Sequence, residues 1–304
     1  MNFTNWLGTL PGVVAQGLIW GIMAIGVFIT FKILDIADLT VDGSICTGAA
    51  VCAVLVTVYG VNIWVAILAA TVAGVLCGLV TGLIHTLLGI PAILAGILTQ
   101  LMLWSVNLIL MGKSNVALPG QVYHVAVSNL EERLLQTNLT LILFVAGLIA
   151  LLYWFFGTEL GSSLRATGNN LHMSRAQGIN TDFAKVLGLM ISNGIVAMSG
   201  ALLAQFSGSA DINMGRGAIV IGLAAVVVGE AVVSKLSSGF IVRLLGVALG
   251  GVCYYFVFST IVFLGLRTDL LKMFSALVVA FFLGMPYVKK RYFKKAVKGG
   301  KKDA

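Results

Sequence analysis

Long, continuously apolar runs recur along this chain, and they restrict its fold more than any other feature. A run of about 18 or more such residues crosses a bilayer as a helix, whereas a transmembrane β-strand alternates polar and apolar residues. Only 10% of the residues are charged, against about a quarter in soluble domains. We therefore predict an all-α, polytopic transmembrane helical bundle of about nine spans, with eight to ten as the range. The predicted spans are 13–31, 44–59, 63–83, 88–111, 139–156, 183–206, 218–233, 240–264 and 273–288.

Positive charge is concentrated at the C-terminal end of the chain. Eight of the nineteen Lys and Arg residues lie in the tail 289–304, directly after the last apolar run. Basic segments beside membrane spans mark the cytoplasmic side, so we interpret the tail as a cytoplasmic C-terminus and not as a nucleic-acid-binding element. Counting nine spans back places the polar segment 157–182 inside, and the loop 112–138 and the N-terminus outside. We expect residues 1–304 to form a single transmembrane domain.

The segment 34–50 interrupts the apolar pattern with three aspartates and is broken at Gly43. It is too apolar for a free loop and too acidic for an ordinary span. One interpretation is a broken or re-entrant helix that lines a polar cavity, because irregular backbone at membrane depth requires such a lining. The other is a short cytoplasmic turn. In either case Asp38 or Asp42 is suited to cap a following helix.

A few polar side chains lie inside the predicted spans. Polar groups in a membrane usually face the interior of the bundle. Gln100, Asn107 and Asn193 are therefore candidates for a translocation path, together with Asp38 and Asp42 of the segment 34–50. Hydrogen bonding between helices is the alternative for Gln100.

One acidic residue near the end of the seventh span forms a separate candidate. Glu230 precedes Lys235 by five residues, so the two are a candidate gate or ion pair. A carboxylate within a membrane is a functional candidate by default, but at the end of a span it more often meets a nearby cation or water.

Catalytic chemistry has no recognisable residue set in this sequence. The tripeptide Gly112-Lys113-Ser114 imitates the end of a phosphate-binding loop, but Asn107 stands where that motif requires its first glycine. We expect no enzyme active site, cofactor or metal in this chain. Polar residues scattered through a bundle instead suggest passage of a solute. Since the centres of the spans carry almost no charge, the energy source is expected outside the chain. Its expected point of attachment is the segment 157–182, which we predict to form a cytoplasmic coupling helix.

Two motifs, in this order, resemble bacterial ABC importer permeases of the branched-chain amino-acid and ribose group. The first is ADLTVDGS at 37–44, after the first long span. The second is RATGNNLHMSRAQGIN at 165–180, followed by a span that contains SGALLA at 199–204. The resemblance covers about residues 12–285. Within the group, the form of the first motif is most similar to a branch associated with tryptophan- and tyrosine-type binding proteins.

The resemblance implies a transport subunit of the bacterial inner membrane. It implies a cytoplasmic ATPase dimer, an extracytoplasmic substrate-binding protein and a second permease chain, with a homodimer expected. The lack of charge at the centres of the spans favours a small neutral or zwitterionic solute, with an amino acid favoured over a sugar or nucleoside. A self-powered secondary carrier or channel is the alternative. The residues that the resemblance assigns to ATPase coupling are Arg165, Asn169, Arg175, Ala176, Gln177, Gly178, Ile179 and Asn180.

Overall fold

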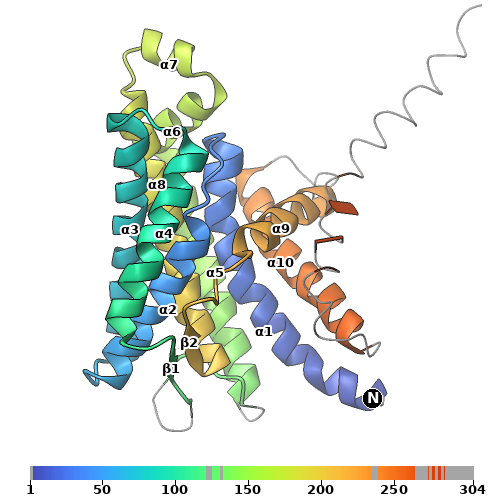
Figure 1. The fold of residues 1–304 in the computed structure, drawn as a ribbon. Coiled ribbons are helices and arrows are strands. Elements are labelled where there is room, and N and C mark those ends of the chain that lie inside the picture. The colour runs from blue at the N-terminus through green and yellow to red at the C-terminus, as the bar shows by residue number, and fades with distance from the viewer. Residues whose placement is uncertain are drawn as a thin grey trace, which may run out of the picture.

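The computed structural model describes residues 3–120, 125–130, 133–233 and 239–263, with positions 273, 276–277, 280–281 and 284. In these parts the chain is almost entirely helical (Figure 1). Its helices are α1 (Phe3–Phe28), the π-helix η1 (Ile29–Ile33), α2 (Val41–Thr57), α3 (Ile63–Leu87), α4 (Ala92–Met111), α5 (Leu134–Gly157), α6 (Glu159–Asn169), α7 (Leu171–Ala176), α8 (Thr181–Ser207), α9 (Ala218–Val233) and α10 (Phe240–Phe263). Its strands are β1 (Asn115–Ala117) and β2 (Ser209–Asp211).

Eight of the nine predicted spans correspond to helices. Six helical stretches in the described residues are long and apolar enough to cross a membrane, namely α1 with η1, α3, α4, α5, α8 and α10. The helices α2 and α9 are equally apolar but have only 17 and 16 residues. The ninth predicted span, 273–288, and the basic tail lie largely or wholly outside the described residues. The predicted helical membrane bundle is therefore confirmed.

Two helices, α1 and α8, form the centre of the bundle. In each, 78% of the most apolar window is buried, compared with 22% in α4, which lies mostly on the surface. Small residues permit the close packing around them. Gly74 and Gly78 of α3 lie against the backbone of α8 at Asn193 and Leu189. These two glycines of α3, four residues apart on one face of the helix, are thus packing residues.

The first long helix breaks near the end of the bundle that carries α6 and α7 (Figure 1). It passes into η1, after which residues 34–40 form no helix before α2 starts at Val41. Asp35 adopts a left-handed backbone with φ of 56°, a conformation uncommon for residues other than glycine. The predicted break is confirmed, but it is shorter than the expected 34–50, because 41–50 belong to α2.

The opposite end of the bundle holds a small antiparallel sheet of β1 and β2 (Figure 1). Val116 faces Ala210 in the register. Residues 208–217, between α8 and α9, then run beside α2. The Cys46 thiol donates to the carbonyl of Ile212 at 3.3 Å and accepts from the N–H of Gly215 at 3.1 Å. The sequence predicted a short loop here, and its attachment to α2 was not foreseen.

Candidate functional site

The candidate coupling segment forms two short helices at one end of the bundle. Thr158 caps α6 by accepting from the N–H of Gly161, and Asn170 caps α7 by accepting from the N–H of Met173 at 3.0 Å. Such side-chain acceptors satisfy backbone donors that have no partner within the helix. The single predicted coupling helix is therefore two helices with a cap between them.

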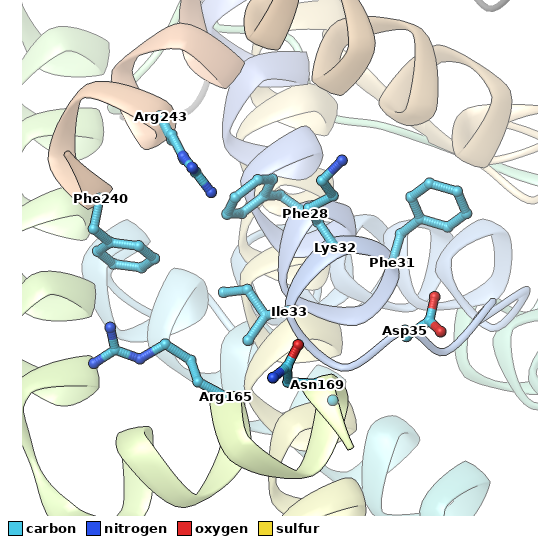
Figure 2. A pocket seen from close by; sticks show the side chains of 10 residues that line it. Phe28, Phe31, Lys32, Ile33, Asp35, Arg165, Asn169, Phe240 and Arg243 are labelled. Atoms are coloured by element: carbon cyan, nitrogen blue, oxygen red, sulfur yellow. The ribbon is translucent and has the colours of Figure 1, made fainter. Parts of the chain in front are cut away.

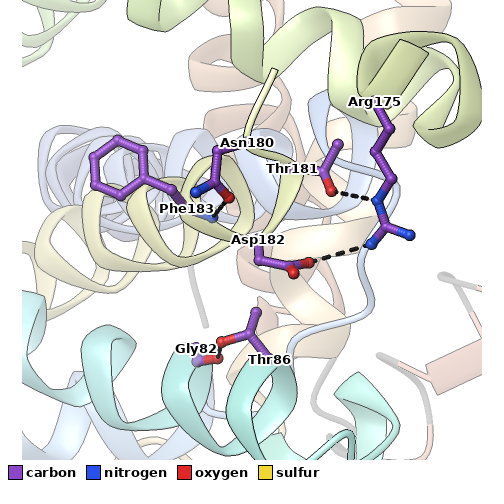
Figure 3. A network of polar contacts seen from close by, with 7 residues as sticks. All are labelled: Gly82, Thr86, Arg175, Asn180, Thr181, Asp182 and Phe183. Carbon is purple, nitrogen blue, oxygen red and sulfur yellow. Dashed lines mark hydrogen bonds and ion pairs between the residues drawn. The ribbon is translucent and has the colours of Figure 1, made fainter. Parts of the chain in front are cut away.

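The motif after α7 builds the turn into α8. Gly178 has φ of 80° and donates its N–H to Arg175 O, while Ile179 donates to Ser174 O, both at 3.0 Å. This pair of bonds with a left-handed glycine is a Schellman motif, which ends a helix. Asn180 then caps α8 by accepting from the N–H of Phe183 at 3.0 Å (Figure 3). The motif thus specifies a helix stop followed at once by a helix start.

Arg175 holds α7 against the first turn of α8. Its Nε donates to the hydroxyl of Thr181 at 2.9 Å, and its Nη2 lies 3.4 Å from Oδ1 of Asp182 (Figure 3). Most other motif residues are exposed around this contact, namely Ala176, Gln177, Gly178 and Asn180, whereas Ile179 is half-buried. The tip of the coupling segment is a structured, solvent-facing turn.

The two earlier candidates of this segment, Arg165 and Asn169, lie away from the tip. The Arg165 guanidinium donates to the carbonyl of Phe156 and lies 5.7 Å from the ring centroids of Phe156 and Phe240. Arg165 and Asn169 both line a cavity between the end of α1 with η1, α6 and α10 (Figure 2). The eight coupling candidates therefore divide into an exposed tip and a pair that faces the bundle.

Helix α6 rests directly on the break after α1. Gly168 lies against the carbonyl oxygen of Ile33, and a β-carbon at this position would be 2.8 Å from the Cα of Leu34. The side chain of Leu34 in turn lies against Gly188 of α8, and the side chain of Leu164 lies near the same glycine. The coupling segment therefore contacts the break backbone to backbone, where there is no side chain to absorb a displacement.

Residues of the break belong to a buried polar network. The Asp38 carboxylate accepts from the N–H of Thr40 at 2.9 Å and from Nδ2 of Asn193 at 2.7 Å. Oδ1 of Asn193 accepts from the Ser44 hydroxyl at 2.6 Å. The hydroxyls of Thr40 and Thr81 are 2.8 Å apart. Two path candidates, Asp38 and Asn193, are thus bonded to each other and join the break to α8.

Asp42 caps a helix, although not the one expected. Its two carboxylate oxygens accept from the N–H groups of Gly217 and Ile219, each at 2.9 Å, and so cap α9, which lies far along the chain. A β-carbon at Gly43 would lie 3.2 Å from the Cα of Gln100, near the middle of α4. The first turns of α2 and α9 therefore meet deep in the bundle, where their dipoles favour negative charge.

The remaining path candidates line a cavity at this meeting point. Its volume is about 300 Å³, and its walls come from α2, α4 and the stretch before α9. Asp42, Gln100 and Asn107 all line it. Asn107 is 1% exposed, and neither polar atom of its amide has a hydrogen-bond partner in the described structure. Because a buried amide without partners is costly, we expect Asn107 to find a polar partner in this cavity.

Arg216 also lines this cavity and was not among the predicted site residues. Its exposed side chain makes no ion pair with the described residues. The sequence signal that could have identified Arg216 is its position as a lone cation between two glycines, just before an apolar run. Trp104, 44% exposed, adds an aromatic wall.

Glu230 pairs with a residue from the first helix. Its Oε2 lies 3.0 Å from Nζ of Lys32, which links the end of α9 to η1. Lys235, the partner predicted from sequence spacing, lies outside the described residues. The observed ion pair is half-exposed at Lys32, so it is a surface contact at the end of the bundle that carries α6.

Comparison with known proteins places the chain among permeases. A family model described as "Branched-chain amino acid transport system / permease component" matches residues 10–283. The chain is 40% identical over 271 residues to the tyrosine transport system permease protein of Clostridioides difficile (strain R20291), with 89% of each chain covered. It is 31% identical over 276 residues to an uncharacterized protein of Rickettsia prowazekii (strain Madrid E), covering 90% of this chain and 96% of that protein.

A solved structure has a similar fold. A chain of PsaBC from Streptococcus pneumoniae, determined in complex with Fab, superimposes with a TM-score of 0.57. The match covers 97% of this chain and 100% of that one, at 17% identity, so it bears on the fold alone. The sequence matches confirm the resemblance to the branched-chain group and to its tyrosine-type branch. The chain belongs to the family of permease components of branched-chain amino acid transport systems.

Proposed function

We propose that this protein is the transmembrane permease subunit of an ATP-binding-cassette importer of the bacterial inner membrane. The observation that carries this proposal is the direct contact between α6 and the break after α1. That contact connects an exposed helical tip, suited to receive a partner, with a polar network and cavity inside the bundle. A self-powered carrier has no need for such an external handle.

The partners follow from the two ends of the bundle. A cytoplasmic ATPase dimer would hold the tip formed by 175–180, so that this end and the C-terminus face the cytoplasm. A substrate-binding protein would deliver solute at the end that carries β1 and β2. A second permease chain, most simply an identical copy, would complete the path. ATP hydrolysis then belongs to the partner, and this chain has a transport role and no catalytic one.

Transport would proceed by alternating access. Movement of the ATPases would displace α6 and α7, and Gly168 would transmit the displacement to Ile33 and Leu34. From the break, the displacement would pass through the hydrogen bond of Asp38 to Asn193 of α8, and along the chain into α2. A ligand can drive such a change only if it interacts differently with the two states, and the polar cavity beside α2 is where the solute would do so.

The cavity suits a small zwitterion, and an amino acid is the leading candidate. Arg216 and the first turns of α2 and α9 would favour the solute carboxylate, since arginine binds carboxylates through paired hydrogen bonds. Asp42 and the amides of Gln100 and Asn107 would accept from the ammonium group. Trp104 offers a face for a ring, so an aromatic amino acid fits best. The relative from Clostridioides difficile is a tyrosine transport system permease by name, which supports this choice.

The role of the coupling segment is tested by replacing it. The native chain and a variant with a Gly/Ser linker in place of Arg165–Asn180 are purified in mild detergent from cells that make the whole transporter. We expect an ATPase to copurify with the native chain and to be lost from the variant. If no ATPase is retained and the purified chain alone moves solute in liposomes, the carrier alternative is correct.

The solute is tested by uptake into proteoliposomes that contain the complete transporter. Tyrosine should be taken up in preference to leucine and ribose. Arg216→Gln should lower tyrosine uptake by about tenfold or more, the range expected for loss of one charge-assisted hydrogen-bonded contact, and Arg216→Lys should restore part of it. Asn213→Ala, an exposed neighbour, is the control. Equal uptake by Arg216→Gln would contradict the carboxylate assignment.

A further inference from the structure

The stretch of chain that carries Arg216 is seated directly on α2. Residues 212–217 connect β2 to α9 and form a series of turns. Gly215 is buried in this stretch, and a β-carbon at its position would collide with the carbonyl oxygen of Asp42 and with the side chain of Ile45. The backbone just before Arg216 is therefore in direct contact with the start of α2.

Two side chains of α2 hold the backbone on either side of Arg216. On one side, the Cys46 thiol accepts from the N–H of Gly215 at 3.1 Å. On the other side, Oδ2 of Asp42 accepts from the N–H of Gly217 at 2.9 Å. Because Asp42 and Cys46 are four residues apart, they lie on the same face of α2. Together they fix the two residues that flank Arg216.

The Cys46 thiol binds this stretch at two points. It donates to the carbonyl of Ile212 at 3.3 Å in addition to accepting from Gly215. Its side chain is buried, and it lines the 300 Å³ cavity together with Arg216. A buried free cysteine usually serves as a small apolar residue. Two hydrogen bonds to one stretch, at the wall of a cavity, indicate a more specific role for Cys46.

The side chain of Arg216 has no comparable attachment. It is exposed and makes no ion pair with the described residues. The position of its guanidinium therefore depends on the backbone from which the side chain extends. Ordering a long side chain for binding costs conformational entropy, and a mobile backbone would add to that cost. A fixed backbone at 215–217 thus favours binding at Arg216.

The same cavity has a place for a polar occupant. Asn107 lines it from α4, is buried, and has no hydrogen-bond partner for either polar atom of its amide in the described structure. Because an unpaired buried amide is costly, a polar occupant would stabilise the cavity. Cys46 therefore holds one wall of a cavity in which another wall lacks a polar partner.

We propose that Cys46 is a positioning residue for solute binding. By holding 212–215 against α2, its thiol places Arg216 where the guanidinium meets the solute carboxylate. This inference rests on the proposed function, in which Arg216 binds that carboxylate. Cys46 acts through Arg216 and not by touching the solute. Loss of its two hydrogen bonds would free the backbone before Arg216 and leave the bond between Asp42 and Gly217 in place.

The first measurement requires no transport. The purified full-length chain in detergent is placed in deuterated water, and exchange of the backbone N–H groups of 208–217 is followed by mass spectrometry. Hydrogen-bonded amides exchange only when the structure opens locally. We expect exchange in Cys46→Ala to be about threefold faster or more, the range for loss of one weak hydrogen bond. Cys46→Ser should stay close to the native chain, because a hydroxyl can also donate and accept.

A second cysteine of α2 supplies the matched control. Cys52 is buried in the same helix, but it does not line the cavity. Its thiol accepts from Nε2 of Gln205, at 3.7 Å, and makes no printed bond to 212–217. We expect Cys52→Ala to leave both the exchange of 208–217 and the uptake of solute close to native values.

The second measurement asks whether Cys46 acts through Arg216. Tyrosine uptake into proteoliposomes with the complete transporter is compared for the native chain, Cys46→Ala, Arg216→Gln and the double variant. We expect Cys46→Ala to lower uptake about threefold or more on its own, and Cys46→Ser to restore most of it. In the Arg216→Gln background, Cys46→Ala should have no further effect. A general loss of packing, or a direct contact with the solute, would lower uptake by the same factor in both backgrounds.

The outcomes separate this inference from the function on which it rests. Suppose that Arg216→Gln lowers uptake. The positioning role is then wrong if Cys46→Ala has native uptake, if the two effects multiply, or if exchange of 208–217 is unchanged or rises equally in Cys52→Ala, and the carboxylate assignment still stands. If Arg216→Gln takes up tyrosine as well as the native chain, the carboxylate assignment fails and this inference fails with it.

Discussion

Substitution of a single glycine tests whether α6 transmits force to the break after α1. In Gly168→Ala the new methyl carbon would lie 2.8 Å from the carbonyl carbon of Ile33 and from the Cα of Leu34, and closer still to the Ile33 carbonyl oxygen. Ordinary contact begins at 3.4 Å. All three neighbours are backbone atoms that no change of rotamer can move. The two segments must therefore separate by more than the 0.6 Å (3.4 − 2.8 Å) that the two carbon contacts alone require, because the oxygen contact is closer still.

The size of the effect follows from this overpacking. Extra methyl groups in a packed interior cost about 1–3 kcal/mol. If the contact carries the coupling between ATPase and cavity, a loss of that size lowers the coupling about 5- to 150-fold. We therefore expect Gly168→Ala to keep its ATPase and hydrolyse ATP while the amount of solute moved per ATP falls within that range.

The assay compares uptake with ATP hydrolysis in proteoliposomes that hold the complete transporter. Gly157→Ala is the matched control, because it lies at the end of α5 near the same segment and its β-carbon would have no neighbour within 4 Å. Retention of the ATPase in each variant is checked by copurification. A normal ratio of uptake to hydrolysis in Gly168→Ala, or an equal fall in Gly157→Ala, would refute the reasoning.

Three further perturbations probe other contacts. Gly178→Ala should cost about 1 kcal/mol of stability, because a side chain at this position is strained only by the positive φ. Gly178→Trp should uncouple ATP hydrolysis from uptake, because the indole would fill the exposed turn. Normal coupled uptake by Gly178→Trp would contradict the second prediction. Asn193→Ala should lower the thermal stability in detergent by about 1–3 kcal/mol for each buried partner left unsatisfied, and an unchanged melting temperature would refute the network. For the exposed pair of Lys32 and Glu230, a double-mutant cycle should give a coupling energy of less than about 1 kcal/mol, and a larger value would indicate a gate.

The membrane bundle could be predicted from sequence because it depends on local patterns. Continuous apolar runs require helices in a bilayer, and Gly178 with Asn180 signals a helix stop and start. The break after α1 was also readable, because aspartates and a glycine interrupt an apolar run. Even so, its limits were misjudged, since the first turn of α2 contains Asp42 and Gly43 and resembles a loop.

The site depended on contacts that local patterns do not contain. Asp42 is a helix cap, as predicted, but the helix begins 176 positions later in the chain. Glu230 has a cation partner in η1, Lys32, that the sequence did not indicate. The pairing of β1 with β2 joins segments 94 residues apart. Each of these contacts is set by how the helices stack, which spacing along one sequence does not reveal.

The break after α1 is attached on both of its sides, and this restricts how it can move. Asp38 holds it to Asn193 of α8, and Thr40 holds it to Thr81 of α3. Helix α8 is continuous from its cap at Asn180 to Ser207, directly before β2. A displacement of the coupling tip must therefore either break buried hydrogen bonds or carry α8 along its whole length. Because breaking them leaves buried polar groups unsatisfied, we infer that α8 moves as one rigid body and carries the motion from the coupling tip to the far end of the bundle.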